Sequence, residues 1–174
     1  MQHKAVFWDR DGVLNELVAE RADGKKNVSP QVFNDFKLRE GVSHILKQIH
    51  NTGYLNIVVT NQPDITRGAM SETELLKMHE YLKKEIPVID AIAVCPHDDA
   101  NQCDCRKPKP GLLLTAAKEF SIDLRQSYIV GDSVRDIGAG KAAGCKTIFL
   151  KHNEQAVDCN FVINDLKEVL PLII

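Results

Sequence analysis

The stretch Ala5-Val-Phe-Trp-Asp-Arg-Asp-Gly12 places four apolar residues directly before two aspartates that are separated by one residue. A short apolar run of this kind is typical of a strand buried on both faces, in a parallel sheet covered by helices. Open α/β sheets bind their ligands outside the carboxyl ends of the strands. The run therefore predicts a buried strand over residues 5–8 that brings Asp9 and Asp11 to a binding site.

Similar short apolar runs alternate with helical patterns along the rest of the chain. Further strands are predicted over residues 56–60, 91–94, 128–130, 147–150 and 161–163. Apolar residues at helical spacing predict helices between them, with buried faces formed by Val42, Ile45, Leu46 and Ile49, by Leu75, Met78, His79 and Leu82, and by Leu113, Ala116, Ala117 and Phe120. A helix rich in small residues is predicted around residues 137–143. This alternation predicts an α/β fold with a doubly wound, mostly parallel sheet.

Local signals predict where two of these helices end or begin. Gly53 stands where a residue in the left-handed conformation would close the first helix. Ser71 and Glu74 have the spacing of a capping box, which predicts a helix start. Pro87 limits how far that helix can continue.

Length and composition are those of one compact domain. A chain of 174 residues is expected to form a single domain over residues 1–174, because domains commonly contain about 100 to 200 residues. The net charge of −2 provides no general attraction to nucleic acid or to an anionic membrane. The N-terminus lacks a signal-peptide pattern, and no apolar run approaches the roughly 18 residues that span a bilayer. We therefore expect a cytoplasmic monomer that binds neither nucleic acid nor membranes.

Two segments interrupt the alternation of strands and helices. Residues 16–36 form a polar connection much longer than the usual length of about two to six residues. This length predicts a lid or specificity loop, and a simple surface excursion is the alternative. The second segment, residues 96–110, has hardly any apolar side chains with which to pack.

A cluster of cysteine and histidine begins beside this second segment. Three thiols and one imidazole lie within eleven residues: Cys95, His97, Cys103 and Cys105. They could be the four ligands of a closed tetrahedral zinc site, which would be structural because a catalytic zinc normally keeps one position open. Three unrelated cysteines in a loop are the alternative. Zinc would replace the missing apolar core and would order Arg106 and Lys107, which follow the cluster directly.

Polar residues stand at the predicted ends of three strands. Asp9 and Asp11 follow the strand predicted over residues 5–8, and Thr60 and Asn61 stand at the end of the strand over 56–60. Gly131, Asp132 and Asp136 follow the strand over 128–130. Several carboxylates that converge at one edge of a sheet would repel one another unless a cation were present. Magnesium prefers oxygen ligands, few of them from protein and the rest from water and phosphate. The pattern therefore predicts a magnesium site at this edge.

Such a site suits phosphoryl transfer, which needs in-line positioning and neutralisation of the phosphoryl oxygens. Asp9, the first residue after its strand, is the candidate nucleophile that would form an aspartyl phosphate. Asp11 could protonate the leaving alkoxide and then deprotonate the attacking water. The alternative is that both aspartates only cap a turn, a position that Asp favours.

The remaining polar groups would bind the phosphoryl oxygens and the metal. The hydroxyl of Thr60 and the amide of Asn61 can donate hydrogen bonds to the phosphoryl oxygens, and Lys107 supplies a compensating charge. Asp132 is a candidate ligand of the metal. The histidines other than His97 are interpreted as structural or surface residues, because none of them pairs in sequence with a candidate nucleophile.

Four ordered segments of the chain resemble the motifs of the haloacid dehalogenase (HAD) superfamily of phosphatases. They are FWDRDGVLN, VVTNQ with ITRG, CRKPKPG, and YIVGDSVRDIGAGKAAG. The resemblance is closer to the D,D-heptose bisphosphate phosphatase and histidinol-phosphatase branch, and it extends over about residues 5–144. It implies a single-domain, three-layer Rossmann-like fold without a large cap domain and with a zinc-binding loop.

The resemblance implies roles for the residues that match these motifs. Asp9 would be the nucleophile and Asp11 the acid/base, while Thr60 and Lys107 would stabilise the phosphoryl group. Arg106 would contact the substrate. The substrate-binding set predicted in this way consists of Asp9, Asp11, Thr60, Asn61, Arg106 and Lys107.

Two metals are also implied. The magnesium ligands would be Asp9, Asp11 and Asp132, and Asp11 usually meets the metal through its backbone carbonyl in this group. Asp136 would not bind the metal directly but would orient Lys107 or a metal-bound water. The Cys-x-His and Cys-x-Cys pattern of the zinc cluster also occurs in the branch.

The expected activity is magnesium-dependent hydrolysis of a small phosphorylated metabolite. By resemblance, the substrate is D-glycero-D-manno-heptose 1,7-bisphosphate, dephosphorylated at C7 during heptose synthesis for lipopolysaccharide or capsule; histidinol phosphate is the alternative. A non-enzymatic phosphoacceptor signalling domain would place similar groups at strand ends, but it has no use for Asp11 as an acid/base. A zinc-dependent nucleic-acid-binding module is disfavoured by the negative net charge.

Three residues depart from the pattern of the branch. Pro63 and Asp64 stand where it usually has serine and glycine, and Ser133 stands where it commonly has a lysine beside the metal. Pro63 removes a backbone donor, and Asp64 adds negative charge near the expected phosphate. These departures leave the core chemistry intact and bear on the exact substrate.

Overall fold

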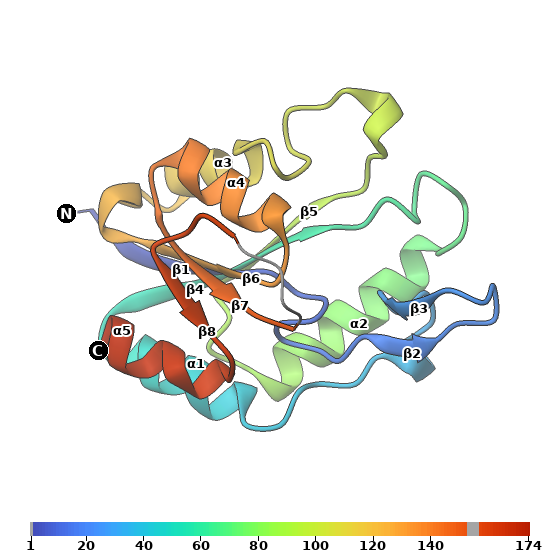
Figure 1. The fold of residues 1–174 in the computed structure, drawn as a ribbon, viewed down its shortest axis with the longest axis horizontal. Coiled ribbons are helices and arrows are strands. Elements are labelled where there is room, and N and C mark those ends of the chain that lie inside the picture. Colours follow the sequence, from blue (N-terminus) through green and yellow to red (C-terminus); the bar gives the residue numbers. More distant parts are fainter. Residues whose placement is uncertain (1, 153–156) are drawn as a thin grey trace.

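The computed structural model describes residues 2–152 and 157–174. The strands of its main sheet are β1 (Lys4–Trp8), β4 (Tyr54–Asn61), β5 (Ala91–Cys95), β6 (Tyr128–Gly131), β7 (Lys146–Leu150) and β8 (Phe161–Ile163). They lie in the order β5-β4-β1-β6-β7-β8, and all neighbouring pairs run parallel (Figure 1). The six predicted strands are confirmed, and so is the α/β fold with a parallel sheet.

Helices cover both faces of this sheet. The helices are α1 (Val42–Asn51), α2 (Glu72–Glu85), α3 (Gly111–Glu119), α4 (Val134–Ala143) and α5 (Leu170–Ile173). α1, α2 and α5 lie on one face, and α3 and α4 lie on the other (Figure 1). Because successive strand residues point to opposite faces, Val6 and Trp8 pack toward α1 and α2, whereas Ala5 and Phe7 pack toward α3 and α4. The molecule therefore has three layers.

α1 follows the predicted pattern. Its buried residues are Val42, Ile45, Leu46 and Ile49. Gly53 has a φ of 87°, and its N–H donates to the carbonyl of His50 at 2.9 Å. A glycine in this conformation satisfies the free carbonyls at the end of a helix without steric cost, so both predictions for this helix are confirmed.

α2 begins as predicted but lacks the full capping box. The hydroxyl of Ser71 accepts a hydrogen bond from the N–H of Glu74 at 3.2 Å. The predicted capping box also needs a hydrogen bond from the N–H of Ser71 to the carboxylate of Glu74, and this part of the prediction is wrong. That carboxylate instead accepts from the N–H of Phe33 at 2.5 Å and pairs with Lys77 at 2.7 Å. Glu74 therefore ties residues 16–36 to α2.

The outermost strands are less buried than predicted. β5 and β8 each have one neighbour in the sheet. The first four residues of β5 are half-buried, and Val162 in β8 is 52% exposed. An edge strand is covered on fewer sides than a central strand, so the expectation of full burial fits only the strands between them.

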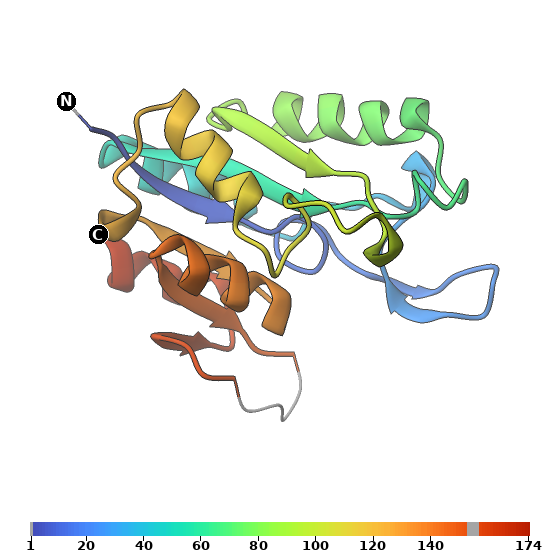
Figure 2. The same cartoon turned by 90° about the horizontal axis from the view of Figure 1, so that it is seen from above.

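Residues 16–36 are structured rather than a loop without strands. β2 (Val18–Glu20) and β3 (Lys26–Val28) pair antiparallel, and we call residues 18–28 the hairpin. Phe33 and Phe36 then pack edge-on against Tyr81 of α2, with 5.6 and 6.4 Å between ring centroids. The hairpin lies beyond the carboxyl ends of β1 and β4, on the opposite side of the molecule from both termini (Figure 2).

Short 3-10 helices occupy four of the described connections: η1 (Phe33–Asp35), η2 (Asp99–Asn101), η3 (Leu124–Gln126) and η4 (Leu166–Val169). η2 lies in the connection from β5 to α3, within the segment predicted to need zinc. None of the described helices is long and apolar enough to cross a membrane.

Candidate active site

The candidate site lies where the strand order reverses. From β1 the chain first fills the positions of β4 and β5 on one side, and then those of β6, β7 and β8 on the other. In such sheets the crevice at this switch point binds ligands. A pocket of 510 Å³ lies there, lined among others by Asp9, Asn61 and Asp132, which stand at or just beyond the ends of β1, β4 and β6. The N–H of Asp9 donates to the carbonyl of Val130 at 2.9 Å, so the sheet itself sets the position of Asp9.

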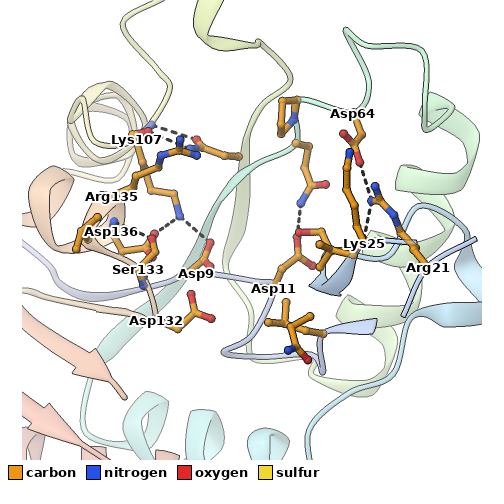
Figure 3. A pocket seen from close by; sticks show the side chains of 18 of the residues that line it. Asp9, Asp11, Arg21, Lys25, Asp64, Lys107, Asp132, Ser133, Arg135 and Asp136 are labelled. Atoms are coloured by element: carbon orange, nitrogen blue, oxygen red, sulfur yellow. Dashed lines mark hydrogen bonds and ion pairs between the residues drawn. The ribbon is translucent and has the colours of Figure 1, made fainter. Parts of the chain in front are cut away.

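Lys107 is a buried cation of this site. Its ammonium donates to Asp9 at 2.6 Å, to the carbonyl of Val59 at 2.8 Å, and to Asp136 (Figure 3). Burial alone would lower the pKa of Lys107, but the carboxylates of Asp136 and Asp9 raise it above its ordinary value. The other oxygen of Asp136 accepts from the N–H of Ser133 at 3.1 Å. Lys107 therefore stays charged, and Asp136 connects its ammonium to the N–H of Ser133.

Three carboxylates converge beside this lysine. Oxygens of Asp9, Asp132 and Asp136 lie within 4.8 Å of one another. Burial raises the pKa of Asp9 well above its ordinary value, and the charges of Asp136, Asp132 and Asp11 raise it further, against the opposite effect of Lys107. A divalent cation would relieve this repulsion, and oxygen donors are those that magnesium prefers. The residues therefore fit magnesium, with the side chain of Asp136 rather than that of Asp11 in the group.

The turn after β1 is shaped around Asp132. Gly12 has a φ of 87°, and a Cβ at this position would lie 2.0 Å from an oxygen of Asp132. The imidazole of His152 lies 3.5 Å from the same carboxylate and 3.1 Å from the carbonyl of Gly12. The sequence interpretation missed His152, which is 140 residues away from Gly12 and carries no motif.

The carboxylate of Asp11 lies apart from the other three, and both of its oxygens accept hydrogen bonds. Arg10 donates to both of its oxygens at 3.0 Å, and the amide of Gln62 donates to Oδ2 at 2.8 Å. The same amide donates to the hydroxyl of Thr60 at 2.8 Å. The sequence analysis assigned no role to Arg10 or Gln62, although both stand inside the motifs that it quoted.

Asn61, the last residue of β4, supports Lys107. Its side-chain oxygen accepts from the N–H of Lys107, and its amide donates to the carbonyl of Lys107, both at 3.1 Å. The side chain of Asn61 is thus occupied in positioning Lys107. Its predicted contact with a phosphoryl oxygen, through the backbone amide, stays a prediction.

Arg106 does not line the pocket that contains Asp9. Its guanidinium donates to Asp99 at 2.7 Å and to the carbonyl of His97 at 3.2 Å, and it lines an adjoining cavity of 190 Å³. These bonds hold it against the loop of the cysteine cluster. Lys107 lines both cavities, so Arg106 adjoins the main pocket through Lys107 without lining it.

Besides Lys107, cationic side chains from three elements line the main pocket. They are Arg21 and Lys25 of the hairpin, Arg67 from the loop after β4, and Arg135 of α4. Figure 3 labels Arg21, Lys25 and Arg135. Asp64 joins two of these elements, because it accepts from Arg21 at 3.1 Å and from Gln31 at 2.7 Å. The residue that departs from the branch at this point thus attaches the hairpin to the site.

The cysteine cluster has the dimensions of a zinc site. The sulfur of Cys105 lies 3.0 Å from that of Cys95, 3.4 Å from that of Cys103 and 3.3 Å from Nδ1 of His97. Four ligands bound tetrahedrally to zinc at about 2.3 Å lie about 3.8 Å apart. The structure brings the four predicted ligands together within 4.8 Å, which fits a zinc ion.

Comparison with known sequences places this site among phosphatases. A model of the HAD-hydrolase-like family matches residues 104–169. The D-glycero-beta-D-manno-heptose-1,7-bisphosphate 7-phosphatase of Haemophilus ducreyi is 36% identical over 99% of this chain and 100% of its own. The D-glycero-alpha-D-manno-heptose-1,7-bisphosphate 7-phosphatase of Campylobacter jejuni is 36% identical over 98% of this chain and 95% of its own.

Solved structures share the same fold. The D,D-heptose 1,7-bisphosphate phosphatase from B. bronchiseptica, complexed with magnesium and phosphate, superposes with a TM-score of 0.80 at 24% identity, covering 97% of this chain and 99% of its own. A putative HAD-like phosphatase from Mesorhizobium loti has a TM-score of 0.79 at 28% identity, covering 99% of this chain and 85% of its own. The predicted single-domain HAD fold is confirmed.

Proposed function

The chain belongs to the D-glycero-D-manno-heptose-1,7-bisphosphate 7-phosphatase family of HAD-like hydrolases, and on this basis we propose that it removes the C7 phosphate of a D-glycero-D-manno-heptose 1,7-bisphosphate. It is a phosphatase, as its motifs predicted. The relative from Haemophilus ducreyi is named for the beta anomer of the sugar, and the one from Campylobacter jejuni for the alpha anomer. Family membership therefore leaves the anomer open. The reaction would supply heptose for lipopolysaccharide or capsule.

The contact between Lys107 and Asp9 carries the chemical part of this proposal. The 2.6 Å contact places a permanent positive charge beside the carboxylate that would attack phosphorus. A phosphoryl group bound there would meet the nucleophile and its neutralising charge at once. A lysine that only stabilised the fold would have no reason to lie in a pocket open to a ligand.

Two successive displacements account for the reaction. An oxygen of Asp9 attacks phosphorus, the bond from phosphorus to the C7 oxygen breaks, and Asp11 donates a proton to the leaving alkoxide. Water then attacks the aspartyl phosphate and gives its proton to Asp11. The bond to Asp9 breaks, inorganic phosphate leaves, and both carboxyls return to their first state.

Both metals belong to this proposal. Magnesium held by Asp9, Asp132 and the backbone carbonyl of Asp11 would neutralise charge on the phosphoryl oxygens. Asp136 lies close enough to join this ion, but its bonds to Lys107 and Ser133 support the predicted orienting role. Zinc in the cysteine cluster would hold the loop that carries Lys107. A monomeric state and a cytoplasmic location stay predictions.

The cations that line the pocket support a substrate with a second phosphate. Arg135 is half exposed, and among the described residues its ion-pair partner is Asp99 at 4.0 Å, so this pairing is loose. Lys25 is 66% exposed at the side chain and reaches Asp23 at 3.4 Å. Both can turn toward an anion at little cost, since exposed ion pairs of this kind contribute only about 0–1 kcal/mol.

The proposal is tested by phosphate release from a substrate panel. The panel contains both anomers of D-glycero-D-manno-heptose 1,7-bisphosphate, the heptose 7-phosphate and histidinol phosphate, each with and without magnesium. We expect magnesium-dependent release from one or both bisphosphates at a higher kcat/KM than from the two monophosphates. Preference for histidinol phosphate would overturn the substrate assignment. A phosphorylated chain that keeps its phosphate for hours would instead indicate a phosphoacceptor domain.

A further inference from the structure

Arg10 is a buried cation of the site that has no part in the reaction described above. Its side chain is 0% exposed, and its Nε and Nη2 donate hydrogen bonds to the carboxylate of Asp11. Its third nitrogen, Nη1, lies 3.1 Å from Nε2 of His79 on α2, and the ring of Phe36 covers the guanidinium at 5.4 Å. Each nitrogen of this guanidinium therefore faces a defined partner. Asp11 is held by a group whose own orientation is determined from α2.

His79 acts as an acceptor in this arrangement. A guanidinium nitrogen can only donate, so the imidazole nitrogen that faces it carries the lone pair. Burial lowers the pKa of His79 to about 4, and the charge of Arg10 contributes to this shift. The ring is therefore neutral at pH 7, with its proton on Nδ1.

The contacts of Asp11 fix the carboxylate on Arg10. Nε of Arg10 lies 3.0 Å from Oδ1, and Nη2 lies 3.0 Å from Oδ2 and 2.9 Å from Oδ1. Gln62 adds one further bond, to Oδ2. A turn of the guanidinium would therefore move both oxygens of the carboxylate that is to transfer the proton.

We propose that His79 is a positioning residue for the acid/base carboxyl of Asp11. By accepting from Nη1, it holds the guanidinium in the plane in which Nε and Nη2 bind the carboxyl of Asp11. His79 touches neither the substrate nor the reacting atoms and acts only through Arg10. The inference rests on the proposed function of Asp11.

The test compares two phosphate esters with different leaving groups. The leaving group of a sugar phosphate is an alkoxide, which needs a proton to depart. The leaving group of p-nitrophenyl phosphate is a stable phenolate, which does not. For His79→Leu we expect kcat/KM to fall on the order of tenfold for the sugar phosphate and less than about twofold for the aryl ester. kcat/KM is used because it reports the first displacement, in which Asp11 is the acid.

Three further measurements make the result specific. His79→Gln keeps an acceptor near the position of Nε2 and should restore most of the lost activity. Glu80→Gln, at an exposed position of the same helix, should change neither ester. Thermal unfolding of each variant shows whether α2 stays packed.

Each outcome decides between distinct conclusions. If His79→Leu lowered kcat/KM equally for both esters, or for neither, the positioning role would be overturned. The proposed phosphatase function would stand. A wild-type chain that is inactive on both esters would instead overturn the proposed function, and this inference with it.

Discussion

The carboxylate cluster (Asp9, Asp132 and Asp136) and the cysteine cluster (Cys95, His97, Cys103 and Cys105) both gather metal ligands, but different parts of the fold build them. The carboxylates stand just after β1 and β6 or on the first turn of α4, at the carboxyl edge of the sheet, where Asp9 and Asp136 are buried and Asp132 is half-buried. Of the cysteine cluster, only Cys95 belongs to a strand, and the other three ligands lie half-buried in the following loop.

The difference concerns what holds each cluster together. In the carboxylate cluster, part of the repulsion is already neutralised by Lys107, which donates to Asp9 and Asp136. The cysteine cluster has no such internal partner among the described residues, and contacts between thiols are weak. We therefore expect the sheet to preserve the first cluster without an ion, and the second to depend on a bound ion for its shape. The two are connected, because Lys107 follows Cys105 by two residues.

The largest expected effect comes from removing the nucleophile of the first cluster. Asp9→Asn keeps the size of the side chain but cannot form the aspartyl phosphate, so turnover should fall by at least about a thousandfold. Zinc content and the circular dichroism spectrum should match those of the wild type. Phosphate release and metal analysis provide the measurements, and substantial remaining activity would show that Asp9 is not the nucleophile.

Metal removal compares the two clusters directly. Transfer into magnesium-free buffer should abolish activity reversibly and leave the thermal unfolding midpoint nearly unchanged. Removal of zinc with a zinc-selective chelator should lower the midpoint by at least about 5 °C, because structural zinc contributes to folding and about 1 kcal/mol corresponds to roughly 2–4 °C in a domain of this size. The contrast would be lost if both treatments lowered the midpoint equally.

A single ligand of the second cluster should have a smaller effect on activity. Cys103→Ser should reduce bound zinc to well below one ion per chain and lower kcat on the order of tenfold, because the loop no longer holds Lys107 in place. Cys159→Ser is the matched control, since Cys159 lies outside the cluster. Unchanged zinc content in Cys103→Ser would argue against the tetrahedral site.

The smallest effect concerns the fit of the turn around Asp132. Gly12→Ala adds a Cβ that would collide with Asp132, whereas Gly24→Ala in the hairpin has the same sign of φ and meets no atom within 4 Å. Gly24→Ala should lower the free energy of unfolding by about 1 kcal/mol, and Gly12→Ala should lower it by at least about twice that amount. Only Gly12→Ala should raise the magnesium concentration for half-maximal activity. Equal unfolding free energies for the two variants would contradict the close approach.

Much of the site could be predicted because its residues are tied to strand ends. Asp9 and Asp132 follow apolar runs whose direction and burial are encoded locally, so their convergence follows from the parallel sheet. The cysteine cluster could be recognised because its ligands are neighbours in sequence. The capping interaction of Glu74 was only half predicted, because the competing partner, Phe33, comes from another segment.

The sequence by itself determined the strands, most of the helix faces and the types of ligand at each cluster, since these depend on neighbouring residues and on periodicity. Only the tertiary structure decided that Arg10 binds Asp11 and His79, that His152 lies beside Asp132, and that Arg106 faces an adjoining cavity. These contacts depend on where buried polar side chains find partners after the layers pack. Such partners can be 69 or 140 residues apart, and no local pattern specifies them.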